Sequence, residues 1–118
     1  MKGKFKTDLT VSPSIGDNWQ LRENLIYISN NGDAYTVPKN FITDLASIPR
    51  VIRSIFAVNS KHRQAAVLHD YLYTKKHISR KMADELFYEA MINSNVTKWK
   101  AKLFYYAVRI GGGFARKV

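Results

Sequence analysis

Aromatic and β-branched residues gather in short runs within the first forty residues, and polar residues typical of turns separate these runs. Extended segments are expected at residues 5–11, 19–21 and 25–28, because such side chains suit the pleated backbone of a strand. The N-terminal part of the chain, residues 1–40, is therefore predicted to be rich in β-structure.

The segment Asn30-Asn31-Gly32-Asp33 predicts a tight hairpin turn. Asparagine and glycine tolerate the positive φ angles that such turns require. Residues 34–37 are expected to return as the partner strand of residues 25–28. Pro38 should end that strand, since proline has no N–H to donate to a sheet.

Beyond residue 50 the apolar residues recur at helical spacing instead. Helices are predicted at residues 50–57 and 60–74. Ser79 is a suitable N-cap for a further helix that ends near Asn93. The helical part is therefore expected to span residues 50–112.

A last helix is predicted to begin after Thr97. It carries an apolar stripe whose members lie three or four positions apart, and this stripe is expected to face the core. The glycine run at residues 111–113 is expected to end the helix. The stripe consists of Trp99, Leu103, Tyr106 and Ile110.

The whole pattern predicts an α+β fold, in which N-terminal antiparallel β-hairpins or a small sheet precede three to four helices. A length of 118 residues fits a single domain, residues 1–118. The chain has no cysteine, which excludes disulfide scaffolds, cysteine-ligated zinc fingers and thiol catalysis. No apolar run reaches the roughly 18 residues of a membrane span, and the first residues lack the apolar core of a signal peptide.

The charge of the chain is strongly positive and unevenly distributed. There are 19 Lys and Arg against 9 Asp and Glu, a formal net charge of +10. Residues 60–118 hold twelve of the basic and four of the acidic residues, a net charge of +8. This half is expected to attract an anionic partner, which could be an acidic lipid surface, DNA or an acidic protein. The alternative is a self-repelling surface that keeps the protein soluble and has no specific partner.

His69 and Asp84 are the residues that most strongly indicate a site. Each lies on the apolar face of its predicted helix, about five or six residues from the short connector between the two helices. Helices joined by so short a connector usually run antiparallel, so the two side chains should face each other. A buried carboxylate opposite an imidazole fixes one tautomer and stabilises the protonated form, as a general base requires. The alternative is a structural hydrogen bond that satisfies a buried histidine.

The segment at residues 41–50 offers a second group of candidates. Asp44 could form an Asx turn that leads into the next helix, which is a purely structural interpretation. In the functional interpretation Asp44 adds a carboxylate to the site around His69, and Arg50 binds an anion. Asp70 lies at the edge of the face that carries His69. A transition-metal site is a weaker alternative, with ligands drawn from His62, His69, Asp70 and Asp84.

Three ordered motifs carry a resemblance to an uncharacterised family of small proteins from tailed phages and prophages. They are Thr43-Asp44-Leu45-Ala46-Ser47-Ile48-Pro49-Arg50, His69-Asp70-Tyr71-Leu72-Tyr73 and Ala83-Asp84-Glu85-Leu86-Phe87-Tyr88-Glu89-Ala90-Met91, within residues 35–112. The resemblance implies a phage origin, and hence a location in the virion or the host cytoplasm.

A narrower resemblance covers about 25 residues. The spacing His69-Asp70-x-x-Tyr73 is similar to the active-site helix of phospholipases A2, and the helix around Asp84 resembles the second helix of their bacterial form. The resemblance implies that His69 is the general base, that Asp84 orients it, and that Tyr73 anchors Asp84. It also implies that Asp70 holds calcium.

The chain departs from that enzyme family in two respects. It has no glycine-rich loop before His69 to complete a calcium shell, and it has none of the family's disulfides. Calcium prefers six or more oxygen ligands, so Asp44 and backbone carbonyls of residues 41–50 would have to assist Asp70. The expected cofactor is therefore calcium or another divalent metal. Arg80 is one of several basic residues, with Lys75, Lys76 and Lys81, near the connector between the two predicted helices. It is a second candidate for binding an anion.

Two functions follow as hypotheses. The first is a metal-assisted hydrolase of phospholipid esters that works through His69, Asp84 and Tyr73. The second is a non-catalytic virion or assembly component of a phage tail or head–tail junction, in which the His–Asp pair is structural and the basic surface binds a partner.

Overall fold

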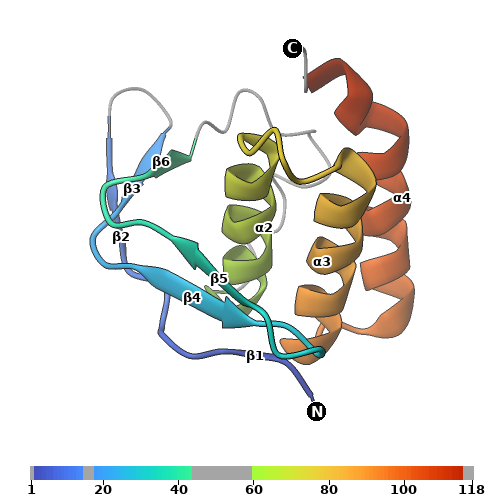
Figure 1. Cartoon of the computed structure of the whole chain (residues 1–118), viewed down its shortest axis with the longest axis horizontal. Coiled ribbons are helices and arrows are strands. Elements are labelled where there is room, and N and C mark those ends of the chain that lie inside the picture. Colours follow the sequence, from blue (N-terminus) through green and yellow to red (C-terminus); the bar gives the residue numbers. More distant parts are fainter. Residues whose placement is uncertain (1, 15–17, 44–59, 116–118) are drawn as a thin grey trace.

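The strands lie on one side of the molecule and the helices on the other (Figure 1). In this computed structural model the described residues are 2–14, 18–43 and 60–115, and side chains in the last range are described for residues 63–111. Helix α2 (Ser60–Tyr73) lies nearest the strands, α3 (Arg80–Asn93) packs beside it, and α4 (Lys98–Ala115) is outermost. The α+β fold expected from the sequence is confirmed.

The strands form two small antiparallel sheets. One sheet has the order β1-β4-β5 and the other the order β2-β3-β6. Helix α2 contacts β4, β5 and β6, whereas α3 contacts β1, so both sheets are held against the helical layer. The strands are β1 (Lys4–Phe5), β2 (Val11–Pro13), β3 (Trp19–Leu21), β4 (Leu25–Ile28), β5 (Ala34–Val37) and β6 (Ile42–Thr43).

The predicted hairpin is present as β4 and β5. Leu25 pairs with Val37 at its open end, and Ile28 pairs with Ala34 next to the turn. Gly32 has a φ angle of 91°, in the left-handed region that glycine adopts without strain. Strand β5 ends before the proline at position 38, as predicted.

The helices begin and end close to where the sequence placed them, with one exception. Ser79 caps α3 as predicted, because its hydroxyl oxygen accepts a hydrogen bond of 3.0 Å from the backbone N–H of Met82. The exception is α4, which was expected to end at the glycine run and instead continues to Ala115. Just before the glycines, the Arg80 guanidinium donates hydrogen bonds to the α4 carbonyls of Val108 and Arg109.

A second prediction about α4 is wrong. The apolar stripe that was expected to face the core is exposed instead. The buried face of α4 carries the smaller residues Ala101 and Val108, which allow the helix to approach α3 closely. Helical periodicity identifies two apolar arcs on this helix but does not determine which of them packs inward.

Two further differences concern the extended segments. Strand β2 includes Ser12 and Pro13, which lie beyond the end of the extended segment predicted at residues 5–11. Strand β6 lies beyond residue 40, where no strand was predicted. The helix predicted at residues 50–57 lies outside the described residues.

The core lies between α2, α3 and the strands. In α2 the five consecutive residues 65–69 are all buried, because this helix has strands on one side and α3 on the other. Among the described residues, the largest fully buried side chains are Tyr27, Phe87, Leu21, Leu25, Leu68, Leu72, Met91, Val37, Val67 and Val108.

Candidate active site

Asp84 on α3 is a completely buried carboxylate with hydrogen-bond donors at both of its oxygens. Oδ1 accepts from His69 and Tyr73 on α2, and Oδ2 accepts from Arg109 on α4. An ionised carboxylate in the interior requires this kind of compensation, because burial removes it from water. Asp84 therefore connects three helices through one side chain.

His69 faces Asp84 across the α2–α3 interface, as the helix positions predicted. Its Nε2 lies 2.7 Å from Asp84 Oδ1, and the residue is only 6% exposed. The ring packs against Phe87, with 4.6 Å between ring centroids. Since Asp84 can only accept when ionised, Nε2 must carry the proton of this hydrogen bond.

The ionisation of the pair follows from its surroundings. Burial lowers the pKa of His69 below its ordinary 6.5, although the hydrogen bond to Asp84 opposes this shift. Burial alone would raise the pKa of Asp84, but hydrogen bonds from His69, Tyr73 and Arg109 lower it on balance. At neutral pH the pair therefore consists of a neutral imidazole and a carboxylate.

Tyr73 lies one helical turn after His69 and reaches the same oxygen. Its hydroxyl donates to Asp84 Oδ1 over 2.6 Å, and its ring lies 4.3 Å from the His69 ring between centroids. Burial, and then the bond to Asp84, raise the pKa of this hydroxyl, so Tyr73 stays protonated and remains a donor. The contact that the phospholipase resemblance implied for Tyr73 is present.

Among the described residues, the hydrogen-bond network of Asp84 consists of His69, Tyr73 and Arg109. Arg109 is its one member that the sequence did not identify. Its Nη1 lies 2.9 Å from Asp84 Oδ2, and the bond to Asp84 raises the pKa of the guanidinium. Its position next to Val108, at the side of the buried face of α4, indicates that it can reach the core. The opposite face of α4 was expected to face the core, and with the helix turned that way Arg109 would point away from Asp84.

Arg80 is also engaged within the molecule. Its Nη1 lies 3.8 Å from Asp84 Oδ2 and donates to the carbonyl of Arg109 over 3.0 Å and, more weakly, to that of Val108 over 3.4 Å. The guanidinium remains about one-third exposed. A role for Arg80 in binding an external anion stays a prediction.

The described residues do not by themselves form a calcium shell. Both oxygens of Asp84 are occupied by donors, which leaves Asp70, half-buried on α2, as the predicted carboxylate ligand among the described residues. One carboxylate supplies at most two of the six or more oxygens that calcium prefers. Within the described part of the chain, no three His, Asp or Glu side chains cluster as a metal site. Asp44, Arg50 and the side chain of His62 lie outside the described residues, so divalent metal binding stays a prediction.

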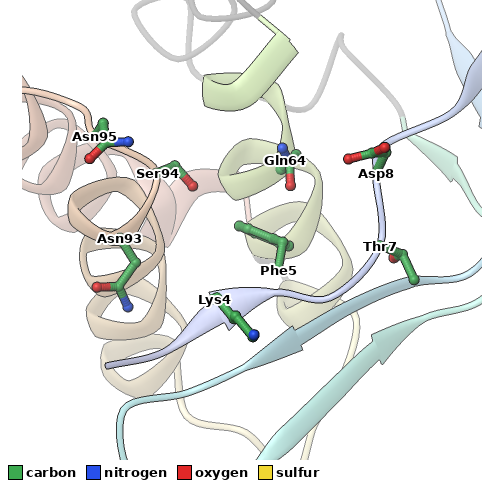
Figure 2. Close-up of a pocket in the computed structure, with 8 residues that line it drawn as sticks. All are labelled: Lys4, Phe5, Thr7, Asp8, Gln64, Asn93, Ser94 and Asn95. Atoms are coloured by element: carbon green, nitrogen blue, oxygen red, sulfur yellow. The ribbon is translucent and has the colours of Figure 1, made fainter. Parts of the chain in front are cut away.

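A separate pocket of about 220 Å³ lies between the N-terminal strand and the ends of α2 and α3. Its lining is mostly polar and includes one ammonium and one carboxylate but no histidine, so it is not part of the Asp84 network. Figure 2 shows its lining residues, which are Lys4, Phe5, Thr7, Asp8, Gln64, Asn93, Ser94 and Asn95.

Comparison with known proteins places this site within a family. The profile of DUF1353, described as a protein of unknown function, matches residues 19–108 and so includes His69, Tyr73 and Asp84. The chain belongs to the DUF1353 family. Arg109 follows directly after the matched segment.

Two curated relatives come from Sinorhizobium fredii, and both are described as uncharacterised. The chain is 34% identical to protein y4iH over 91 residues, which cover 75% of this chain and 38% of the relative. It is 31% identical to protein y4jT over 96 residues, which cover 80% of this chain and 29% of that relative. The aligned part thus spans less than two-fifths of either relative, and no solved structure matches the chain. Among the described residues, no helix is long and apolar enough to cross a membrane.

Proposed function

We propose that this DUF1353 protein is a hydrolase of carboxylic esters in which His69 is the general base and Asp84 orients it. The observation that carries the proposal is the 2.7 Å contact between His69 Nε2 and Asp84 Oδ1, with Tyr73 on the same oxygen. A general base needs a neutral ring, a fixed tautomer and a nearby negative charge to stabilise the protonated state. The pair meets these three requirements.

The direction of proton transfer follows from the hydrogen bond. Because Nε2 donates to Asp84, the lone pair of the ring is on Nδ1. In the proposed reaction Nδ1 takes a proton from a water molecule as the water oxygen attacks the ester carbonyl carbon. The same proton then passes to the leaving alkoxide, and the products are a carboxylic acid and an alcohol.

Phospholipid esters are the proposed substrate class. The half of the chain that carries the site has a net charge of +8, which favours substrates with anionic headgroups. The phospholipase A2 resemblance of the segment from His69 to Met91 points to the same class. In those enzymes a divalent metal polarises the ester carbonyl. Asp70 is the residue that would hold such a metal in this chain.

The test compares release of fatty acid from vesicles of anionic phospholipid by the wild type and by His69→Gln. Glutamine keeps a donor for Asp84 but has no basic nitrogen, so a folded variant should lose about a hundredfold or more of the rate. His77→Gln is the matched control, because His77 is exposed in the connector between α2 and α3. Parallel assays with added calcium and with a chelator test the metal. Equal release by the wild type and His69→Gln would refute the proposal.

The competing function is a non-catalytic virion or assembly component. The observation that favours it is the additional pairing of Asp84 with Arg109, which gives the buried carboxylate a structural role between α3 and α4. In that case His69→Gln leaves every activity unchanged and affects only the free energy of unfolding.

A further inference from the structure

Helix α4 exposes four large apolar side chains in one line. We call this set the α4 stripe: Trp99, Leu103, Tyr106 and Ile110, which are 66%, 52%, 59% and 79% exposed. At about 100° per residue these positions fall within an arc of about 60°, and they extend along about 16 Å of the helix. The stripe is therefore continuous, unlike the single apolar residues that are common on protein surfaces.

Within the described part of the chain, no other element covers the α4 stripe. The opposite side of the helix packs on α3 through Ala101 and Val108, and α4 is the outermost element of the helical layer (Figure 1). A helix with one apolar face packed inward and a second one exposed has a surface available to a partner.

Lysines border the α4 stripe on both sides. Lys98 and Lys102 lie about 60–100° to one side of it, and Lys100 lies about as far to the other, close enough to Trp99 for a cation–π contact of 5.7 Å. All three lysines are exposed, and α4 contains no acidic residue. The surface therefore consists of an apolar centre with a positively charged border.

We propose that the α4 stripe binds the surface of a lipid bilayer that contains anionic headgroups, with the helix lying in the plane of the interface. Leu103 and Ile110 would enter the apolar layer, while Trp99 and Tyr106 suit the boundary between acyl chains and headgroups. The lysine stems extend past the apolar residues and place their ammonium groups among the lipid phosphates.

The side chains favour this partner over two others. A nucleic acid would pair with the lysines and stack on Trp99, but it offers no apolar layer for Leu103 and Ile110. A second copy of the chain would cover the apolar centre but would bring together two proteins of net charge +10, with no acidic residue on α4 to pair with the lysines. A bilayer with anionic lipids complements both the centre and the border.

This inference rests on the proposed function only for its lipid substrate class and adds to it a surface that binds a bilayer, and binding does not require hydrolysis. Co-sedimentation of the full chain with vesicles measures binding directly, with and without phosphatidylglycerol in phosphatidylcholine. The His69→Gln variant should bind as the wild type does. If it binds but the wild type releases no fatty acid, the hydrolase proposal fails and the membrane surface stands.

Two variants separate the contribution of the apolar side chains to binding from that of the lysines. Leu103→Gln with Ile110→Gln should weaken binding about tenfold or more, since two apolar side chains no longer enter the bilayer. Lys98→Gln with Lys100→Gln and Lys102→Gln should weaken it about tenfold or more at low salt. The matched control changes three exposed lysines outside α4, Lys2, Lys6 and Lys39, to glutamine and should bind within about twofold of the wild type.

Tryptophan fluorescence identifies the part of the molecule in contact with lipid. In a Trp19→Phe background Trp99 is the only tryptophan, and its emission should shift to shorter wavelength when vesicles are added. Three results would overturn the proposal: no binding above that to pure phosphatidylcholine, equal weakening by the control lysines, or a dimer in solution that shields Trp99 without lipid. Binding to DNA that the Leu103 and Ile110 changes leave intact, with no binding to vesicles, would assign the surface to nucleic acid instead.

Discussion

Arg109 Nη1 lies 2.9 Å from Asp84 Oδ2, so the carboxylate that contacts His69 from α3 is also bound from α4. His69 and Arg109 therefore share one negative charge, one at each oxygen. A catalytic carboxylate that is paired with arginine stabilises a protonated histidine less than an unpaired one would. The Arg109 contact therefore bears both on the ionisation of His69 and on the stability of the α3–α4 packing.

Asp84→Asn should destabilise the protein strongly. The change removes the fully buried charge to which His69, Tyr73 and Arg109 donate, and the loss of hydrogen bonds to a buried charged group costs about 1–3 kcal/mol or more. Glu85→Gln is the matched control, because Glu85 is the exposed neighbour on the same helix and its change should cost less than about 0.5 kcal/mol. Urea unfolding followed by circular dichroism measures both. A cost below about 1 kcal/mol for Asp84→Asn would mean that the network is not maintained in solution.

Arg109→Met tests how the charge of Asp84 is shared. Without the guanidinium, the carboxylate should hold a proton on His69 more strongly, so the pKa of His69 should rise. The free energy of unfolding should also fall, since the buried carboxylate of Asp84 loses one hydrogen bond from a charged group. Titration of the His69 ring by NMR measures the pKa.

Lys100→Met on the exposed part of α4 provides the control for removing a positive charge from this helix, and it should leave the His69 titration unchanged. An unchanged titration in Arg109→Met as well would show that the Arg109 contact has no influence on the histidine.

The structure also makes a prediction about pH. The pKa of His69 is lower in the folded protein than its ordinary 6.5, so between these two values the unfolded chain binds a proton that the folded one does not. The free energy of unfolding should therefore fall as the pH is lowered through this interval, by up to about 1.4 kcal/mol per pH unit. The pKa of Asp84 is lowered from 3.8, so its contribution is retained above that value and lost only as the pH falls below it.

Unfolding measurements from neutral pH down to about pH 4 would record this dependence. His69→Gln should flatten the curve just below pH 6.5, and His77→Gln at an exposed position is the control substitution. A wild-type curve that is already flat in this interval would contradict the lowered pKa of His69.

The contact between His69 and Asp84 could be predicted from the sequence because it depends on local rules. Helical spacing places each residue on an inner face, and a short connector fixes the relative height of the two helices. The contact of Arg109 could not be predicted in this way, since it depends on how α4 is rotated about its own axis. That rotation is set by the fit of Ala101 and Val108 against α3, and the more apolar arc around Leu103 remains outside.

Strand pairing shows the same difference between features set by local sequence and features set by long-range packing. The turn at Gly32 determines the β4–β5 hairpin locally, and its position was predicted. Strand β6 has two residues and exists because Trp19 and Gln20 of β3 offer an edge for Thr43 and Ile42 to pair with. No local signal in a two-residue segment indicates such pairing, so it appears only when the folded chain brings β3 beside it.

Gly111→Ala tests whether α4 continues through its glycines. A Cβ at position 111 would meet nothing within 4 Å, and the backbone there is helical rather than left-handed. Alanine should therefore raise the free energy of unfolding by about 0.5–1 kcal/mol, because it restricts the unfolded chain more than glycine does and favours the helix. If the helix instead ended here with a left-handed glycine, alanine would be strained and the same change would destabilise the protein. The sign of the change in urea unfolding distinguishes the two cases, and a decrease would contradict the continuous helix that presents the α4 stripe.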